Sequence, residues 1–284
     1  RKVLRMPAMD NAMPELERQL EFRPTVNEDP AHLDPRQIRR FNEEGYVFPL
    51  DVFAADEAAA NRDYFDDLMA RSAAGGWDAY SINGWHKHCA AIHDLVTEPR
   101  ILDYVQDLLG EDLICWGTHY FCKLPGDTRQ VSWHQDASYW PLTPSRTVTV
   151  WLAIDDAEED NGPMTVIAGS HRRGQIPFDR SAPEEENVLN QTVSSPESHG
   201  KAPVPFVMKA GQISLHSDLL LHGSNPNWSD RRRCGLTMRF VPPEVRAHHG
   251  WNTNAVVCRG RDPYSHWIHH PRPHGEKCYL CGLD

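Results

Sequence analysis

Long apolar runs are missing from this 284-residue chain. Its most apolar stretch, residues 148–154, has the length of a strand, whereas a helix that crosses a membrane needs about 20 apolar residues. The chain starts with basic residues, but the apolar segment of a secretory signal does not follow them. We therefore expect a cytoplasmic protein that does not contact a membrane.

Basic residues are scarce as well. The chain has 29 Lys and Arg against 40 Asp and Glu, which gives a formal net charge of −11. A protein that binds nucleic acid usually carries a basic surface, so the composition disfavours that class. With 40% hydrophobic residues the chain can bury a large core. We expect it to act on a small molecule, as a monomer or homodimer.

Cysteines are too few, seven in all and odd in number, for a small secreted domain held together by disulfides. Cys278 and Cys281 form a C-x-x-C pair, and His269, His270 and His274 lie just upstream. Such a group is either a zinc site or a tail that packs on the domain. Because no second clean ligand pair accompanies it, we favour the tail.

Helices are expected in the first half of the chain. Residues 1–35 are rich in Pro, Glu, Arg and Asn and indicate an extended N-terminal arm. Asp34 and Pro35 have the pattern of a helix start, and Gly45 is expected to end that helix. The elements expected next are a strand at residues 46–50 and helices at residues 56–71 and 99–109.

After Gly110 the sequence changes to short segments rich in β-branched and aromatic residues, separated by Gly, Pro, Asn and Asp. The expected strands are residues 113–123, 147–154, 164–167, 204–208, 212–216 and 234–241. Helices first and many short strands afterwards favour a mainly β (α+β) fold, a jelly roll with N-terminal helices packed on the sheet. We expect one domain over residues 36–284, with its jelly-roll core at about residues 113–242.

Residues 178–203 have little strand character. They are polar and long for a loop inside a compact domain, so we expect either disorder or a lid. Together with the N-terminal arm and residues 77–90 and 251–273, this segment is expected to decide which substrate binds.

The stretch W-H-Q-D that ends at Asp136 carries the clearest chemistry. In an extended segment residues i and i+2 point the same way, so His134 and Asp136 can both reach one metal ion. His216 and His222 are the candidates for a third ligand. Two imidazoles and one carboxylate form the ligand set of non-haem iron(II) oxygenases. The same donors can hold a zinc ion that activates water in a hydrolase, and a His-x-Asp pair alone arises easily by chance.

Three arginines, Arg231, Arg232 and Arg233, follow the second histidine cluster. A guanidinium binds a carboxylate through two parallel hydrogen bonds and stays charged at any working pH. A five-carbon diacid that chelates iron through one end needs such an anchor at its other end. For Arg231 and Arg232 a solvated turn is the simpler explanation.

In combination, these segments resemble the phytanoyl-CoA dioxygenase superfamily. The similarity lies in W-H-Q-D at residues 133–136, D-N-G-P-M at 160–164, A-G-S-H at 168–171, and H-G-S at 222–224 with an arginine eleven residues after His222. It spans about residues 113–242 in the right order. The resemblance implies an iron(II)- and 2-oxoglutarate-dependent dioxygenase with a double-stranded β-helix, the cupin-like form of the jelly roll.

The resemblance also implies the metal ligands. His134, Asp136 and His222 would bind the iron. His216 then remains as a hydrogen-bonded neighbour of the site. Halogenating relatives carry Ala or Gly in place of the carboxylate, so the presence of Asp136 favours hydroxylation over halogenation.

For the cosubstrate, the resemblance implies that Arg233 binds the distal carboxylate of 2-oxoglutarate, helped by Ser224. Dioxygen would be the second cosubstrate. Further contacts near the cosubstrate or the mouth of the site are expected from Thr118, Tyr120, Cys122, Trp140 and Trp151.

We therefore expect an oxygenase that hydroxylates, or otherwise oxidises, an unactivated C–H bond of a small hydrophilic metabolite or natural-product intermediate, with release of succinate and CO2. An acyl-CoA substrate, which the family allows, is less expected, because residues 231–233 are the one basic cluster that offers itself to phosphates. A non-catalytic jelly-roll binding protein is the alternative from another class. An intact ligand triad together with Arg233 disfavours it.

Overall fold

The computed structural model describes residues 12–78, 80–182 and 185–277. Its α-helices are α1 (Pro35–Glu44), α2 (Ala55–Ala74), α3 (Ala90–Val96) and α4 (Pro99–Leu109). Its strands are β1 (Tyr46–Asp51), β2 (Leu113–Lys123), β3 (Val131–His134), β4 (Leu142–Thr143), β5 (Val148–Ala153), β6 (Met164–Ile167), β7 (Asp179–Arg180), β8 (Gln191–Thr192), β9 (Pro203–Pro205), β10 (Gln212–Ser217), β11 (His222–Ser224), β12 (Arg233–Val241), β13 (Arg246–Ala247) and β14 (Val256–Arg259). Among these described residues, no helix has both the length and the apolar character needed to span a bilayer.

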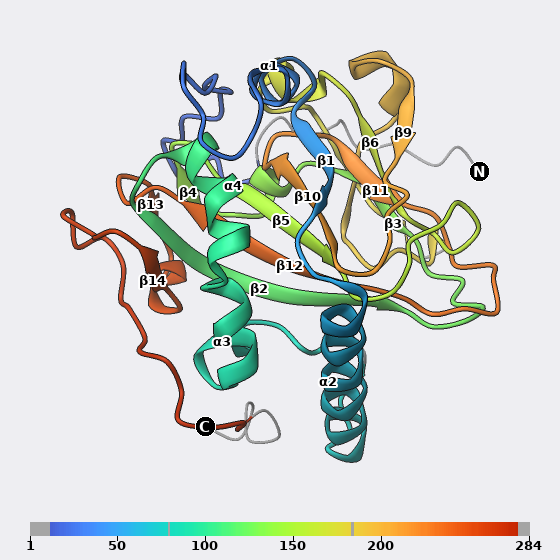
Figure 1. Ribbon diagram of the computed structural model, residues 1–284. Helices are drawn as coiled ribbons and strands as arrows, with labels where there is room; N and C mark the ends of the chain where they lie inside the picture. The colour runs from blue at the N-terminus through green and yellow to red at the C-terminus, as the bar shows by residue number, and fades with distance from the viewer. Residues whose placement is uncertain (1–11, 79, 183–184, 278–284) are drawn as a thin grey trace.

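Two antiparallel sheets form the centre of the fold (Figure 1). The larger sheet has six strands in the order β1-β10-β5-β12-β2-β14, and the smaller has four in the order β3-β11-β6-β9. Strands that neighbour each other in space are far apart in the sequence, as in the pair β2 and β12, whose residues pair from Lys123 with Arg233 to Ile114 with Val241. This arrangement confirms the mainly β jelly roll, with α-helices that come from the N-terminal part of the chain.

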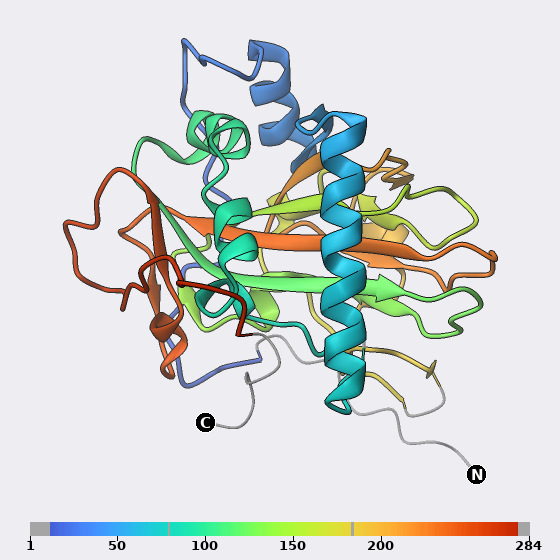
Figure 2. The same ribbon diagram turned by 60° about the horizontal axis from the view of Figure 1, so that its bottom comes forward.

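Helices α2, α3 and α4 cover the outer face of the six-stranded sheet (Figures 1 and 2). On that face Tyr120 and Cys122 of β2 and Leu236 of β12 belong to the same buried core as Phe65 of α2. Because side chains alternate along a strand, the residues between them point the other way, toward the four-stranded sheet. The large sheet therefore has one face in a helix-covered core and one face available to build a site.

Local signals set several boundaries as expected. The carboxylate of Asp34 accepts hydrogen bonds from the backbone N–H groups of Arg36 and Gln37 at the start of α1, and Gly45 ends this helix with a left-handed φ of 90°. Helix α4 begins at Pro99 and stops before Gly110. A capping side chain, a proline and a glycine act locally, so the sequence alone reveals them.

Other elements differ from the expectation. Helix α3 has only seven residues, too few to display a helical period, and we did not expect it. The strand expected at residues 204–208 is β9 at Pro203–Pro205. Strand β3 ends at His134, so Asp136 lies in the 3-10 turn Asp136–Ser138 instead of an extended segment.

The segment of residues 178–203 lies against the site. Apart from residues 183–184 it is described, and the backbone of Gln130 pairs with it, accepting from Val188 N–H at 2.9 Å and donating to the Glu186 carbonyl at 3.1 Å. Val188 and Leu189 line the cavity described below. This arrangement fits a lid more closely than a disordered loop.

Residues 12–34 run along the domain without helix or strand. The carboxylate of Asp107 in α4 accepts the backbone N–H groups of Ala31, His32 and Leu33 at 2.7–3.1 Å, which ties the arm to the helix. The boundary between an arm and a domain from residue 36 stays a prediction. Cys278 and Cys281 lie outside the described residues.

His86 links three segments of the fold. Its Nδ1 lies 3.0 Å from Thr118 Oγ1 on β2, and its Nε2 lies 2.7 Å from the carbonyl oxygen of Asn254. Burial lowers the pKa of His86 to about 4, from an ordinary value of 6.5. Between these two pH values the unfolded chain binds more protons than the folded protein, so stability rises with pH through this window.

We expect His86 alone to reduce the free energy of unfolding by about 2 kcal/mol when the pH is lowered from 7 to 5. Urea denaturation at both pH values measures the loss. In a His86→Gln variant the difference in the free energy of unfolding between pH 7 and pH 5 should shrink by that amount. The His32→Gln variant, at an exposed histidine, should keep the wild-type difference. An unchanged pH dependence in His86→Gln would contradict the assignment.

Candidate metal centre

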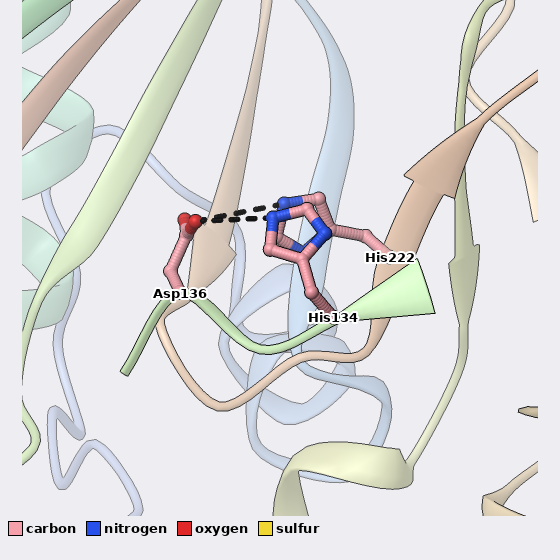
Figure 3. Close-up of side chains that lie close together, drawn as sticks. All are labelled: His134, Asp136 and His222. Carbon is pink, nitrogen blue, oxygen red and sulfur yellow. Dashed lines mark ion pairs between the residues drawn. The ribbon is translucent and has the colours of Figure 1, made fainter. Parts of the chain in front are cut away.

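His134, Asp136 and His222 come together between the two sheets (Figure 3). His134 ends β3, His222 begins β11, and the two are direct partners in the antiparallel ladder, which puts both rings on one face. The Oδ1 atom of Asp136 lies 3.5 Å from Nε2 of His134 and 3.8 Å from Nε2 of His222. One ligand atom from each residue lies within 4.8 Å of the others. The three side chains are therefore placed so that they would hold one metal ion between them.

Backbone carbonyls orient the two imidazoles. The Nδ1 atom of His134 lies 2.7 Å from the carbonyl oxygen of Ser132, and Nδ1 of His222 lies 2.8 Å from that of Leu220. A carbonyl only accepts, so each Nδ1 carries the proton and each Nε2 presents a lone pair toward Asp136. Both histidines are therefore held in the tautomer that binds a metal ion.

The charge states fit a metal site too. Burial and the neighbouring ring of His134 lower the pKa of His222 to about 3, so this ring is neutral at pH 7. Burial by itself raises the pKa of Asp136, but His222, His134 and His216 lower it by more, and it lies well below its usual value. Two imidazole nitrogens and one carboxylate suit iron(II) in a site with open positions.

Gln135, the residue between the two ligands of the motif, fixes the motif to the chain before His222. Its Nε2 donates to the carbonyls of Leu219 at 2.7 Å and Gly174 at 2.8 Å, and its Oε1 accepts the N–H of Ile176 at 2.7 Å. The side chain is buried and every polar atom is paired. Gln135 thus fixes the position of the W-H-Q-D stretch relative to the third ligand, His222.

The N-terminal arm supports the other side of the turn. The Nη1 atom of Arg18 donates to the carbonyls of Ala137 at 2.8 Å and Trp140 at 2.9 Å. Ala137 lies within the 3-10 turn that Asp136 opens, and Trp140 follows shortly after it. The carboxylate ligand is therefore positioned by a segment far away in the sequence.

A cavity of about 370 Å³ opens beside the three ligands, between the inner faces of the two sheets. Four residues expected near the cosubstrate line it: Trp140, Trp151, Ser224 and Arg233. Its wall also contains Tyr80, His119, Phe121, Val131, Tyr139, Thr149, Met164, Val188, Leu189, His216, Gly223, Thr237 and Arg239.

Arg233 is 3% exposed, yet no carboxylate pairs with it in the part of the chain that the structure describes. Its Nη1 makes one long hydrogen bond, 3.5 Å to the Phe121 carbonyl, and its Nε has no partner there. The guanidinium lies 5.8 Å from the centre of the Trp151 ring, and Gly235 makes room for that ring, because a Cβ at Gly235 would overlap it. Burial lowers the pKa of Arg233, but an arginine stays charged in proteins. A buried cation without a counter-charge is a binding site for an anion.

The other two arginines of the cluster point away from the cavity. Arg231 pairs with Asp160 at 2.6 Å and Glu158 at 2.9 Å, and Arg232 pairs with Asp155 at 2.8 Å. Their charges are compensated at or near the surface. Of the three, only Arg233 is available to a ligand in the cavity.

Thr118, Tyr120 and Cys122 lie on the wrong face of β2, which corrects the expectation. Tyr120 and Cys122 are packed in the core beneath α2, and Thr118 Oγ1 lies beside His86. The residues between them, His119 and Phe121, line the cavity instead. The sequence of β2 predicts the alternation, but β2 alone does not show which of the two alternating sets faces inward.

A better signal was present in β12. Arg233 faces the cavity, and alternation from it predicts that Thr237 and Arg239 do so as well, as the structure shows. The ladder then pairs Thr237 with His119 of β2, which gives the inward face of that strand. His119, Thr237 and Arg239 are thus cavity residues that we did not predict from the sequence.

His216 is a neighbour of the ligands, with its Nε2 3.8 Å from Oδ2 of Asp136. It is not the hydrogen-bonded neighbour that we expected, because neither ring nitrogen has a hydrogen-bond partner among the described residues. Its ring lines the cavity.

Comparison with known proteins supports this picture. The model of the family Phytanoyl-CoA dioxygenase (PhyH) matches residues 41–235, well over half of the chain. A probable alpha-ketoglutarate-dependent hypophosphite dioxygenase of Stutzerimonas stutzeri is 30% identical over 228 residues, which are 74% of this chain and 79% of that protein. The ectoine dioxygenase of Sphingopyxis alaskensis is 26% identical over 266 residues, 86% of this chain and 82% of that protein.

Among solved structures, the non-haem monooxygenase ThoJ in its apo form superposes with a TM-score of 0.72 at 28% sequence identity. The match covers 84% of this chain and 88% of that one. The family match and the relatives together identify the class of the enzyme. The chain belongs to the phytanoyl-CoA dioxygenase family and is an iron(II)- and 2-oxoglutarate-dependent dioxygenase.

Proposed function

We propose that this enzyme hydroxylates an unactivated C–H bond of a small hydrophilic metabolite or natural-product intermediate. His134, Asp136 and His222 hold the iron in this proposal, and Arg233 binds the distal carboxylate of 2-oxoglutarate. When bound, iron and 2-oxoglutarate supply the activation of dioxygen, with succinate and CO2 as co-products. The observation that carries the proposal is the buried Arg233, a cation to which the described residues offer no counter-charge, in the same cavity as a His-Asp-His cluster.

The side chains of this chain bind and orient the reactants. The carbonyls of Ser132 and Leu220 keep the two imidazoles in place, and Trp151 lies over the guanidinium that takes the cosubstrate. Aromatic and aliphatic residues, Val188 and Leu189 of the 178–203 segment among them, form much of the wall. Such a wall excludes water from a reactive centre.

A small substrate is favoured over an acyl-CoA. The basic cluster that a phosphate group would need is compensated, because Arg231 and Arg232 are paired with acidic side chains. Two relatives are named as dioxygenases of ectoine and of hypophosphite, neither of which is an acyl-CoA. A cytoplasmic location and a monomeric or homodimeric state remain predictions.

The proposal predicts that the protein releases succinate from 2-oxoglutarate when iron(II) and ascorbate are present, even without a primary substrate. Uncoupled turnover of this kind is measured by succinate release, and a metabolite screen then looks for compounds that stimulate it. Zinc in place of iron should give none.

Three results would contradict the proposal. Retention of a hydrolytic activity in zinc, with none gained on adding iron(II) and 2-oxoglutarate, would favour a hydrolase. Binding of 2-oxoglutarate without any release of succinate would favour a non-catalytic binding protein. Strong stimulation by a branched acyl-CoA would reverse the choice of substrate.

A further inference from the structure

A row of polar side chains crosses the floor of the cavity. His216 of β10, Thr149 of β5 and Arg239 of β12 are direct partners in the ladder, His216 with Thr149 and Thr149 with Arg239. All three line the cavity. Because neighbouring strands lie about 4.8 Å apart, the three side chains follow one another within about 10 Å.

Polar atoms of these three side chains lack hydrogen-bond partners within the described residues. Both ring nitrogens of His216, Oγ1 of Thr149 and Nε of Arg239 are buried without a hydrogen bond. A buried polar group that is left unpaired costs free energy, so three in one row are unusual in a folded protein. The hydrogen-bond partners of this row are therefore expected to come from a ligand in the cavity.

Two tryptophans hold the guanidinium of Arg239 without neutralising it. Its Cζ lies 4.9 Å from the ring centre of Trp140 and 5.3 Å from that of Trp116. Contacts of this kind use the face of the guanidinium and leave the N–H groups at its edge free. Gly117, the partner of Arg239 on β2, has no side chain to take its space, since a Cβ there would already touch Nη1 at 3.4 Å. The described residues place no salt bridge on Arg239, whereas Arg231 and Arg232 each have one.

Arg239 and Arg233 lie well apart on β12. Their Cα atoms are six residues apart on one strand, about 20 Å. A five-carbon diacid that is chelated to the metal at one end and bound by Arg233 at the other uses both of its carboxylates. Arg239 is then left over, and it lines both this cavity and a second one of about 420 Å³ bounded by residues 249–251 and Asn254.

We propose that the primary substrate carries an oxyanion, a carboxylate or a phosphonate-like group, which Arg239 binds with Thr149 and His216 as further hydrogen-bond partners. The guanidinium supplies two parallel N–H donors, and the hydroxyl lies beside it on the next strand. This inference rests on the proposed function, because it assigns Arg233 to the cosubstrate. It adds the substrate class and a specificity-determining residue.

The test uses the full chain loaded with iron(II) and saturating 2-oxoglutarate under argon. The visible charge-transfer band of that complex first reports whether metal and cosubstrate are bound, which tests the proposed function separately. Pentanoate, butylphosphonate and the neutral pentanamide are then titrated by calorimetry. At least one anion should bind about 10-fold or more tightly than the amide, as expected for a charge-assisted pair in a buried site. The anion that binds more tightly shows whether the site prefers a carboxylate or a phosphonate.

Arg239→Gln should abolish the preference for the anion and leave the charge-transfer band intact. Thr149→Val should weaken the preference only partly, and Arg231→Gln, at a surface arginine, should preserve it. If Arg239→Gln does not fold, Arg239→Lys decides: it keeps the charge, so a reduced preference for the anion should remain.

Three outcomes would overturn the inference while leaving the proposed function in place. The band forms but the anions bind no better than the amide; the preference survives in Arg239→Gln; or Arg239→Gln weakens 2-oxoglutarate as strongly as a substitution at Arg233 does. An absent band in the wild-type protein would instead refute the proposed function.

Discussion

Replacing Asp136 with Ala is expected to abolish succinate release and to weaken iron(II) binding by more than about 100-fold, since even the loss of a residue that only orients a metal ligand costs about 10- to 100-fold. Asp136 supplies the carboxylate of the cluster, and its pKa, held well below the usual value by His222, His134 and His216, keeps it charged at neutral pH. Two neutral imidazoles alone leave the charge of the ion uncompensated.

The fold should survive the Asp136→Ala change. The turn is held by the backbone of Ala137 and by Gln135, not by the carboxylate of Asp136. Metal titration monitored by calorimetry measures the affinity, and the thermal unfolding midpoint without metal checks the fold. Asp230→Ala, at a surface carboxylate that is 94% exposed, is the matched control. Unchanged iron affinity in Asp136→Ala, with a normal unfolding midpoint, would remove this residue from the ligand set.

The sequence revealed most where the determinants are local. Asp34, Gly45 and Pro99 act on their own neighbours, so the boundaries of α1 and α4 could be predicted. The ligand pair of the W-H-Q-D motif needs only two residues of separation. The predicted pairing of His134 with Asp136 holds although Asp136 lies in a turn, because Gln135 and the N-terminal arm position that turn beside His134.

Register was harder to predict. Whether the even or the odd residues of β2 face the cavity depends on how β2 pairs with β12, more than 100 positions away, and a strand buried on both faces gives no alternating pattern. For the same reason the unpaired polar row of His216, Thr149 and Arg239 is invisible in the sequence. Its members lie on three strands, and only the ladder makes them neighbours.

Arg233→Gln is expected to raise the dissociation constant of 2-oxoglutarate by about 100-fold or more, because a buried, charge-assisted pair contributes about 3–5 kcal/mol when only one partner is removed. Iron binding should change less than about 2-fold, since both histidine ligands lie on the opposite sheet and Arg233 is not part of the ligand cluster. The protein should be no less stable without 2-oxoglutarate, because the substitution removes a buried cation that no carboxylate among residues 12–78, 80–182 and 185–277 pairs with.

A second ligand makes this prediction specific to the distal carboxylate. 2-Oxopentanoate has the same chelating end as 2-oxoglutarate but no carboxylate at the other end. If Arg233 anchors that group, the wild-type protein binds 2-oxopentanoate much more weakly than 2-oxoglutarate, and Arg233→Gln binds the two about equally. Arg231→Gln, whose arginine pairs with Asp160 at the surface, should behave like the wild type. Should Arg233→Gln still prefer 2-oxoglutarate while Arg239→Gln does not, the anchor lies at the other end of β12, and the two arginines exchange roles.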